Sequence, residues 1–144
     1  MSHHKTHKLP CRVYYENTDA GGIVYHGQYL NFAERGRTEL LRHIGYQSSD
    51  LTSELGVMFV ARFLDINYFA PAFLDDLLDV HTSVSALKNT SFTMRQTFFR
   101  QKDGINEKIA ELTVTLVCVK ADTIKPVRVP ENLREGFAPY IEKD

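Results

Sequence analysis

A carboxylate, two glycines and a histidine lie within eight residues of one another near the start of the chain. They are Asp19, Gly21, Gly22 and His26. Adjacent glycines let the backbone adopt conformations that other residues avoid and approach a ligand closely. The following pattern predicts a helix that begins close to His26, and a helix start presents unpaired N–H groups and partial positive charge that can hold an oxyanion. A carboxylate beside such donors is an arrangement that acyl transfer can use.

Asp19 has two interpretations on spacing alone. A short acidic side chain ahead of a helix is commonly an N-cap or turn residue that accepts hydrogen bonds from nearby N–H groups. A carboxylate that is ionised at neutral pH can also act as the base that activates water, or as the nucleophile that takes the acyl group. The spacing leaves both interpretations open.

A strand, a loop and a helix are expected to carry these residues. Residues 9–16 are predicted as the first strand, residues 17–22 as the loop and residues 28–45 as an amphipathic helix. Gly36 lies inside this helix, where a glycine costs stability unless the helix is pressed against a sheet. The helix is predicted because its apolar residues recur at helical spacing. These are Tyr29, Phe32, Ala33, Gly36, Leu40, Leu41 and Ile44.

The rest of the chain consists mainly of predicted strands. Polar segments at 88–90 and 102–104 predict hairpin turns between neighbouring strands. Long antiparallel strands after one early helix favour an α+β architecture, in which a sheet wraps around a central helix. The strands are expected at 57–69, 77–87, 91–101 and 108–120, with a short helix or loop at 48–55, an extended segment at 126–130 and a short helix from Glu131.

Length and composition describe one ordinary globular domain. The polar residues 1–8 are expected to be a disordered tail, which leaves residues 9–144 as a single domain large enough for a core. A net charge of −1 argues against a nucleic-acid-binding surface. No apolar run approaches the length of a membrane-spanning helix, and the N-terminal residues lack the apolar core of a signal peptide, so a cytoplasmic location is expected. Two cysteines without zinc spacing predict neither a disulfide framework nor a metal site.

One long motif resembles a known family. The chain is similar to the hotdog-fold acyl-CoA thioesterases of the 4-hydroxybenzoyl-CoA thioesterase type, in their YbgC-like, Tol-Pal-associated branch. The similarity is densest over residues 12–42, and the later strands fit the same fold through about Pro130. It implies a hotdog fold and metal-free hydrolysis of acyl-CoA to a free acid and CoA, within lipid metabolism. The motif consists of Tyr15, Thr18, Asp19, Gly22, Val24, Tyr25, His26 and Tyr29, followed by Phe32, Glu34 and Arg37.

The resemblance also implies roles for individual residues of the loop. It makes Asp19 the essential acidic residue, as general base or as nucleophile, and the sequence does not choose between the two. His26 would hold the thioester oxygen through its backbone N–H, while its ring orients the base or the substrate; the alternative is a structural or exposed histidine. Further oxyanion donors are expected from the neighbouring backbone N–H groups of Gly22, Ile23, Val24 and Tyr25.

Two further positions keep a structural alternative. Tyr15 matches a tyrosine whose hydroxyl belongs to the family's site, although Tyr14 and Tyr15 would point to opposite faces of a strand and one of them is then a packing residue. Glu34 and Arg37 are three residues apart on the helix and are expected to form a structural pair. Some relatives take their carboxylate from the helix, so Glu34 is the reserve catalytic candidate.

The implied partners are acyl-CoA, with acyl carrier protein as another possible carrier, and further copies of the chain. Relatives form dimers or dimers of dimers, so a homo-oligomer is expected, either a dimer or a homotetramer, with the site at the protomer interface. Phosphates of CoA need cations, although each available cation can also be a solvated surface charge. The cations on predicted strands or turns are Arg62, Lys88, Arg95, Lys120 and Arg128.

Two other functions are alternatives to thioester hydrolysis. The first is a non-catalytic acyl-thioester or acyl-carrier-protein binding protein linked to cell-envelope and phospholipid metabolism, which only a measured turnover distinguishes from an enzyme. The second is a hotdog hydratase, whose Asp-x-Asn-x-x-His pattern is not matched, because Asn17 precedes Asp19 and His26 follows seven residues later.

Overall fold

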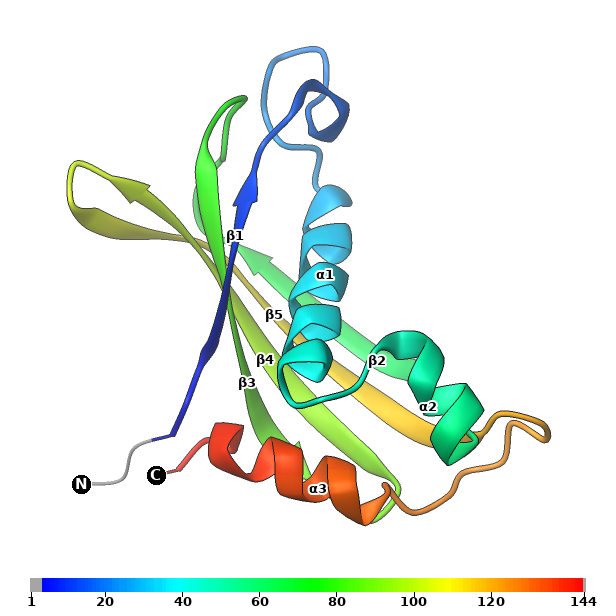
Figure 1. The fold of residues 1–144 in the computed structure, drawn as a ribbon. Coiled ribbons are helices and arrows are strands. Elements are labelled where there is room, and N and C mark those ends of the chain that lie inside the picture. The colour runs from blue at the N-terminus through cyan, green and yellow to red at the C-terminus, as the bar shows by residue number, and fades with distance from the viewer. Residues whose placement is uncertain (1–3, 144) are drawn as a thin grey trace.

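The computed structural model describes residues 4–143, and within them five strands form one antiparallel sheet in the order β1-β3-β4-β5-β2 (Figure 1). The predicted α+β architecture is therefore confirmed. The last hairpin is tighter than expected, because Asp103 and Gly104 both take positive φ angles of 52° and 76° and let Lys102 pair with Ile105. The strands are β1 His7–Arg12, β2 Val57–Tyr68, β3 Leu77–Leu87, β4 Ser91–Lys102 and β5 Ile105–Lys120.

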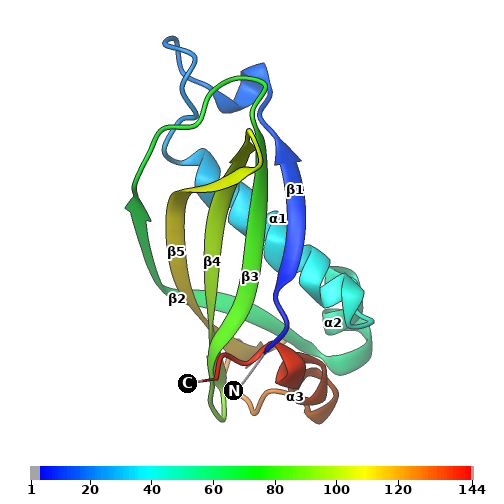
Figure 2. The same ribbon diagram turned by 90° about the vertical axis from the view of Figure 1, so that its left-hand side faces the viewer.

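The long helix α1, Gln28–His43, packs on one face of this sheet (Figure 2). Gly45, at φ 111°, follows the helix and ends it as expected. The shorter helices α2, Ser48–Leu55, and α3, Glu131–Phe137, close the end of the layer that lies away from the start of α1 (Figure 1). Two 3-10 turns, Tyr15–Asn17 and Ala138–Tyr140, complete the described structure.

Gly36 brings α1 unusually close to the sheet. A Cβ atom at this position would lie 2.9 Å from Gln96 Nε2 and from Val80 Cγ1, and 3.1 Å from Thr82 Oγ1. The prediction that this glycine marks a close helix–sheet contact is confirmed. The contact is also polar, because the fully buried Gln96 amide donates to the Ala33 carbonyl at 2.7 Å and to Thr82 Oγ1 at 3.0 Å.

The N-terminal part of the chain differs from the prediction at both ends of the first strand. β1 begins at His7, and the Lys5 N–H donates to the Pro139 carbonyl at 2.8 Å, so residues 5–8 are held in place rather than forming a free tail. Residues 1–3 of the predicted tail lie outside the described residues. The strand ends at Arg12 rather than residue 16, because the backbone of Val13 pairs with Asp75 and Asp76, and a 3-10 turn follows.

No helix among residues 4–143 is both long and apolar enough to cross a membrane.

Candidate active site

Asp19 uses one carboxylate oxygen to shape its own loop. Its Oδ1 accepts the N–H of Gly21 at 2.8 Å and that of Ile23 at 3.4 Å, and Gly22 turns the backbone at φ 80°. Within the described residues its Oδ2 makes no hydrogen bond, and the side chain is exposed. The turn and catalytic interpretations are therefore compatible, because one oxygen holds the loop while the other is free to meet water or a carbonyl carbon.

The start of α1 leaves its N–H groups without side-chain partners. Gly27 is the N-cap, no side chain caps the helix, and its first turn contains no acidic residue. Within residues 4–143, no hydrogen bond is made by the N–H of His26 or of Gly27. A 16-residue helix thus presents an unneutralised positive end and free donors just beyond the Asp19 loop.

The N–H groups of Gly22, Val24 and Tyr25 are not free, which corrects the expectation that they supply oxyanion donors. Gly22 donates to the Asp19 carbonyl at 3.1 Å, Val24 to the Ala72 carbonyl at 2.9 Å and Tyr25 to the Asn17 carbonyl at 2.9 Å. These bonds fix the path of the loop, which spacing in the sequence does not reveal. The available donors are instead the N–H groups of His26 and Gly27, at the start of α1.

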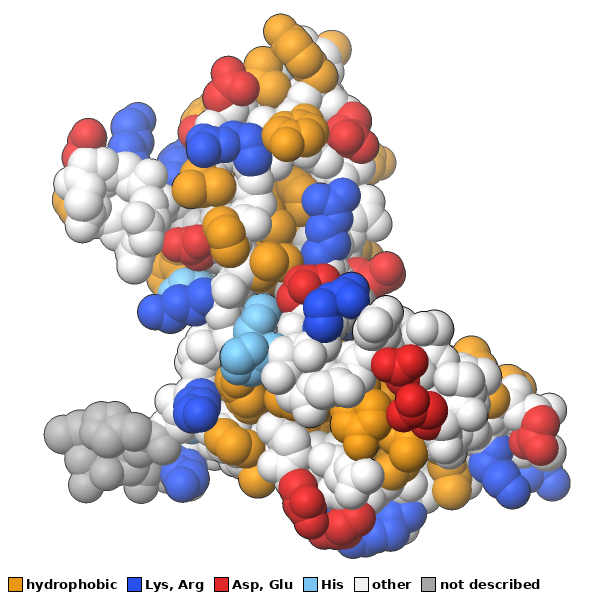
Figure 3. Space-filling model, in the orientation of Figure 1, with side chains coloured by type: hydrophobic (Ala, Val, Ile, Leu, Met, Phe, Trp, Pro, Cys, Tyr) orange, Lys and Arg blue, Asp and Glu red, His pale blue; other side chains and the backbone are white. Residues whose placement is uncertain are grey.

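Aromatic side chains surround this loop at the surface. Tyr15 is 82% exposed and belongs to a 3-10 turn, so the expectation of two tyrosines on opposite faces of a strand is wrong. The Tyr25 ring lies against the His26 ring, with centroids 4.3 Å apart and the ring planes tilted by 38°. Figure 3 shows hydrophobic side chains gathered at this end of the molecule. The exposed ones from the loop and its neighbours are Tyr14, Tyr15, Ile23, Tyr25 and Phe73.

Two side chains that sequence reasoning missed hold the loop to the start of α1. Tyr68, at the end of β2, donates its hydroxyl to the His26 carbonyl at 2.8 Å. The buried Asn17 accepts the Tyr14 N–H at 2.8 Å and donates to Gln28 Oε1 at 3.0 Å, which joins both ends of the loop. Asn17 sits within the motif, but its side-chain partners become apparent only in the fold.

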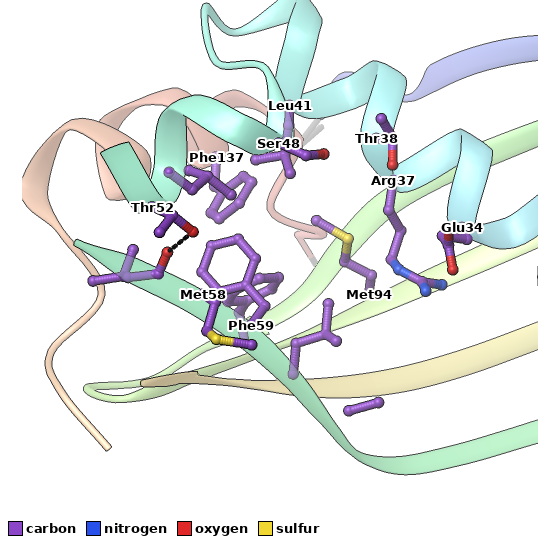
Figure 4. Close-up of a pocket in the computed structure, with 15 residues that line it drawn as sticks. Glu34, Arg37, Thr38, Leu41, Ser48, Thr52, Met58, Phe59, Met94 and Phe137 are labelled. Atoms are coloured by element: carbon purple, nitrogen blue, oxygen red, sulfur yellow. Dashed lines mark hydrogen bonds between the residues drawn. The ribbon is translucent and has the colours of Figure 1, made fainter. Parts of the chain in front are cut away.

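A cavity of about 390 Å³ lies between α1, α2, α3 and the sheet (Figure 4). Its wall is mainly apolar, and Glu34 and Arg37 lie together at one end. The predicted Glu34–Arg37 ion pair is not formed within the described residues, because the Arg37 guanidinium turns inward and donates to Gln96 Oε1 at 2.9 Å. Burial lowers the pKa of Arg37, and the charge of Glu34 opposes that shift. The apolar wall includes Leu41, Leu51, Phe59, Phe92, Met94, Leu116 and Phe137.

Some of the candidate phosphate ligands are already bonded to other side chains, and some are not. Arg95 is held by Glu142 at 3.0 Å and Glu111 at 3.5 Å, and Arg128 donates to Asn89 Oδ1 at 2.8 Å. Among residues 4–143, Arg62, Lys88 and Lys120 form no ion pair. Arg62 lies beside Ala61, which lines the cavity.

No cluster of three or more histidine, cysteine, aspartate or glutamate side chains in the described part of the chain has a geometry that suits a metal ion.

Comparison with known proteins decides the family. The family model described as thioesterase superfamily matches residues 21–106, which include His26, α1, strands β2 to β4 and the start of β5. This chain belongs to the thioesterase superfamily. It is 41% identical over 130 residues to the acyl-CoA thioester hydrolase YbgC of Escherichia coli O6:H1, covering 90% of this chain and 94% of that protein. The chain is therefore an enzyme of the thioester hydrolase class, as the motif predicted.

Solved structures of thioesterases share the fold. A probable thioesterase from Bartonella henselae superposes with a TM-score of 0.80 at 34% identity, covering 88% of this chain and 100% of that one. A 4-hydroxybenzoyl-CoA thioesterase superposes with a TM-score of 0.86, covering 92% and 98%, and its 17% identity supports the fold alone. The predicted hotdog fold is confirmed.

Proposed function

We propose that this thioesterase hydrolyses acyl-CoA to a free acid and CoA, with Asp19 as the catalytic carboxylate and the start of α1 as the oxyanion site. The observation that carries the proposal is the uncapped first turn of α1 next to a carboxylate with one unoccupied oxygen. The names of the relatives, which include acyl-CoA thioester hydrolase, point to the same substrate class.

The N–H groups of His26 and Gly27 polarise the thioester carbonyl and hold the negative charge that develops on its oxygen. Asp19 Oδ2 either removes a proton from the attacking water or attacks the carbonyl carbon itself, in which case water then hydrolyses the acyl-enzyme. The C–S bond breaks, and CoA departs as a thiolate, which needs little help from a general acid. Tyr68 and Asn17 keep the donors aimed by holding both ends of the loop.

The acyl group is proposed to enter the apolar cavity below α1, with the cavity of one subunit served by the catalytic loop of another. β2 is a sheet edge with five exposed apolar side chains: Met58, Val60, Phe63, Leu64 and Tyr68. The opposite edge, β1, instead carries Lys8, Pro10 and Arg12, residues that discourage edge pairing. This contrast makes β2 the edge at which two copies pair.

Antiparallel pairing of β2 with its own copy brings the separated parts of the site together. A pairing centred on the middle of Val57–Tyr68 places Tyr68 opposite Val57 of the partner subunit. Tyr68 holds the His26 carbonyl, and Val57 and Met58 line the cavity. The start of α1 in one subunit would then lie beside the cavity of its partner, with Glu34 and Arg37 at its polar end.

Release of free thiol from a panel of acyl-CoA substrates tests the proposed function. We expect turnover that depends on acyl size, because an apolar cavity of limited volume accepts some acyl groups better than others. We also expect equal rates with and without EDTA. Absence of turnover on the entire panel would favour a binding protein, and activity lost to EDTA and restored by a divalent ion would contradict the metal-free mechanism.

Replacing His26 with alanine removes its ring but leaves the backbone N–H at the helix start. We expect kcat to fall roughly 10–100-fold, less than the roughly 10²–10³-fold that loss of a whole oxyanion donor costs. Steady-state kinetics on one good substrate measures the change, with circular dichroism as the check on folding. Tyr14→Ala is a suitable control, because it removes an exposed ring next to the loop while leaving its N–H bond to Asn17. A loss beyond 10³-fold would show that the ring itself carries the chemistry.

A further inference from the structure

The catalytic loop is paired, backbone to backbone, with the segment that connects β2 to β3. Val24 donates to the Ala72 carbonyl at 2.9 Å, and Leu74 donates to the Gly22 carbonyl at 3.1 Å. Ile23 and Phe73 form an antiparallel bridge between these two bonds. The connecting segment, residues 71–76, therefore positions the loop along its length, in addition to the bond from Tyr68 of β2 at the His26 carbonyl.

This connecting segment is irregular and strained. Asp75 has a φ of 72°, a conformation that a non-glycine residue keeps only where its surroundings impose it. Its N–H donates to the Val13 carbonyl at 3.0 Å, and its own carbonyl accepts Arg12 Nη1 at 2.9 Å. Such a segment needs an anchor if the loop paired with it is to hold a fixed geometry.

Arg100 on β4 provides that anchor at both ends of the segment. Its Nη1 donates to the Pro71 carbonyl at 3.1 Å and to Asp76 Oδ2 at 2.7 Å. The same Asp76 oxygen accepts the Phe73 N–H at 2.9 Å, and the guanidinium lies 5.6 Å from the centre of the Phe73 ring.

The other side of the guanidinium is fixed by β5. Its Nε and Nη2 both donate to Glu107 Oε1, and Arg100 is only 8% exposed. The planar fork of an arginine can hold several acceptors in a fixed arrangement, which a lysine ammonium cannot reproduce. The guanidinium thus ties the connecting segment to two central strands of the sheet.

We infer that Arg100 is a positioning residue for thioester hydrolysis, which sets the catalytic loop by clamping the segment at residues 71–76. The inference rests on the proposed function for its catalytic consequence. Displacements of the order of 1 Å at a reacting centre can cost about 10²-fold in rate. A loosened segment would therefore displace Asp19 and His26 and lower the rate, although Arg100 contacts neither residue.

The test is Arg100→Lys, which keeps the positive charge but removes the planar guanidinium and its forked set of N–H donors. We expect kcat to fall at least roughly 10-fold while KM stays within about threefold, because the acyl cavity lies elsewhere. Arg95→Lys is the matched control. Arg95 lies on the same strand, its ion pairs with Glu111 and Glu142 remove it from the candidate phosphate ligands, and it touches neither the loop nor the segment. Its kcat and KM should both stay within about twofold of wild type.

Amide hydrogen exchange gives a readout that does not depend on catalysis. The N–H groups of Val24 and Leu74 report the two bonds between loop and segment, and we expect their exchange to accelerate in Arg100→Lys but not in Arg95→Lys. The amides of Met94 and Val114, which lie opposite each other in the sheet, should stay protected. Acceleration of all four amides alike would indicate a general loss of stability and would overturn the inference.

Asp76→Asn is the second variant, and it decides the question if Arg100→Lys does not fold. It keeps the side chain's shape but weakens the clamp, so a smaller loss in kcat and the same selective exchange at Val24 and Leu74 are expected. Unchanged exchange and kcat in the folded variants would refute the clamp. If wild type hydrolyses no acyl-CoA at all, the proposed function fails, while the exchange data still test whether Arg100 holds the loop.

Discussion

Asp19→Asn should reduce kcat by roughly 10²–10⁴-fold, the range that a general base contributes. The amide keeps the shape of the side chain, and its oxygen can still accept the N–H groups of Gly21 and Ile23 that fold the loop. The charge on the free oxygen is lost, so the residue can neither take a proton from water nor attack a carbonyl carbon. The loss should therefore appear in kcat while thermal stability stays near that of wild type.

Glu34→Gln is the comparison that assigns the catalytic carboxylate. Glu34 lines the cavity, lies on α1 and forms no ion pair with Arg37, so it is the other carboxylate placed to meet an acyl group. We expect its substitution to cost much less than that of Asp19, and mainly in KM. Both variants are to be assayed on one substrate with unfolding curves recorded for each. An inactive Glu34→Gln beside a nearly normal Asp19→Asn would move the chemistry from the loop to the helix.

The parts of the fold that were predictable are those set by local patterns. Alternation along β3, β4 and β5 placed these strands to within three residues, because one face of each is buried. Gly36 predicted the close helix–sheet contact, because a glycine inside a helix lowers helix stability unless the helix packs closely against a sheet.

The parts that were not predictable depend on residues distant in sequence. β1 ends at Arg12 because the backbone of Val13 bonds to Asp75 and Asp76, more than 60 residues later. Local strand propensity cannot predict that pairing. Helical spacing favoured an ion pair between Glu34 and Arg37, but Arg37 instead donates to the buried Gln96, 59 residues away in sequence. Of the expected oxyanion donors, the N–H of Val24 is bonded to a residue distant in sequence, Ala72, whereas the N–H groups of Gly22 and Tyr25 are bonded within the loop.

A charge placed at the middle of the β2 edge should separate the subunits and abolish most of the activity. Phe63 is 53% exposed near the centre of β2, and in a centred pairing it faces Arg62 of the partner subunit. Phe63→Lys therefore sets like charges opposite each other across the pairing, and lysine is a residue that natural sheet edges use to prevent such contact. Because the proposed cavity and catalytic loop belong to different subunits, dissociation should remove the complete site.

Sedimentation and specific activity measured over a range of protein concentrations test this expectation together. For Phe63→Lys we expect monomers at assay concentration and at least a roughly 10-fold drop in specific activity, since substrate and catalytic groups are no longer held together. Activity should rise again as concentration drives reassociation. Ile105→Lys is the matched control, because it replaces another exposed apolar side chain at the β4–β5 turn, away from β2 (Figure 1). A Phe63→Lys monomer with full activity would show that each chain holds a complete site, and the acyl group would then have to reach Asp19 within a single subunit.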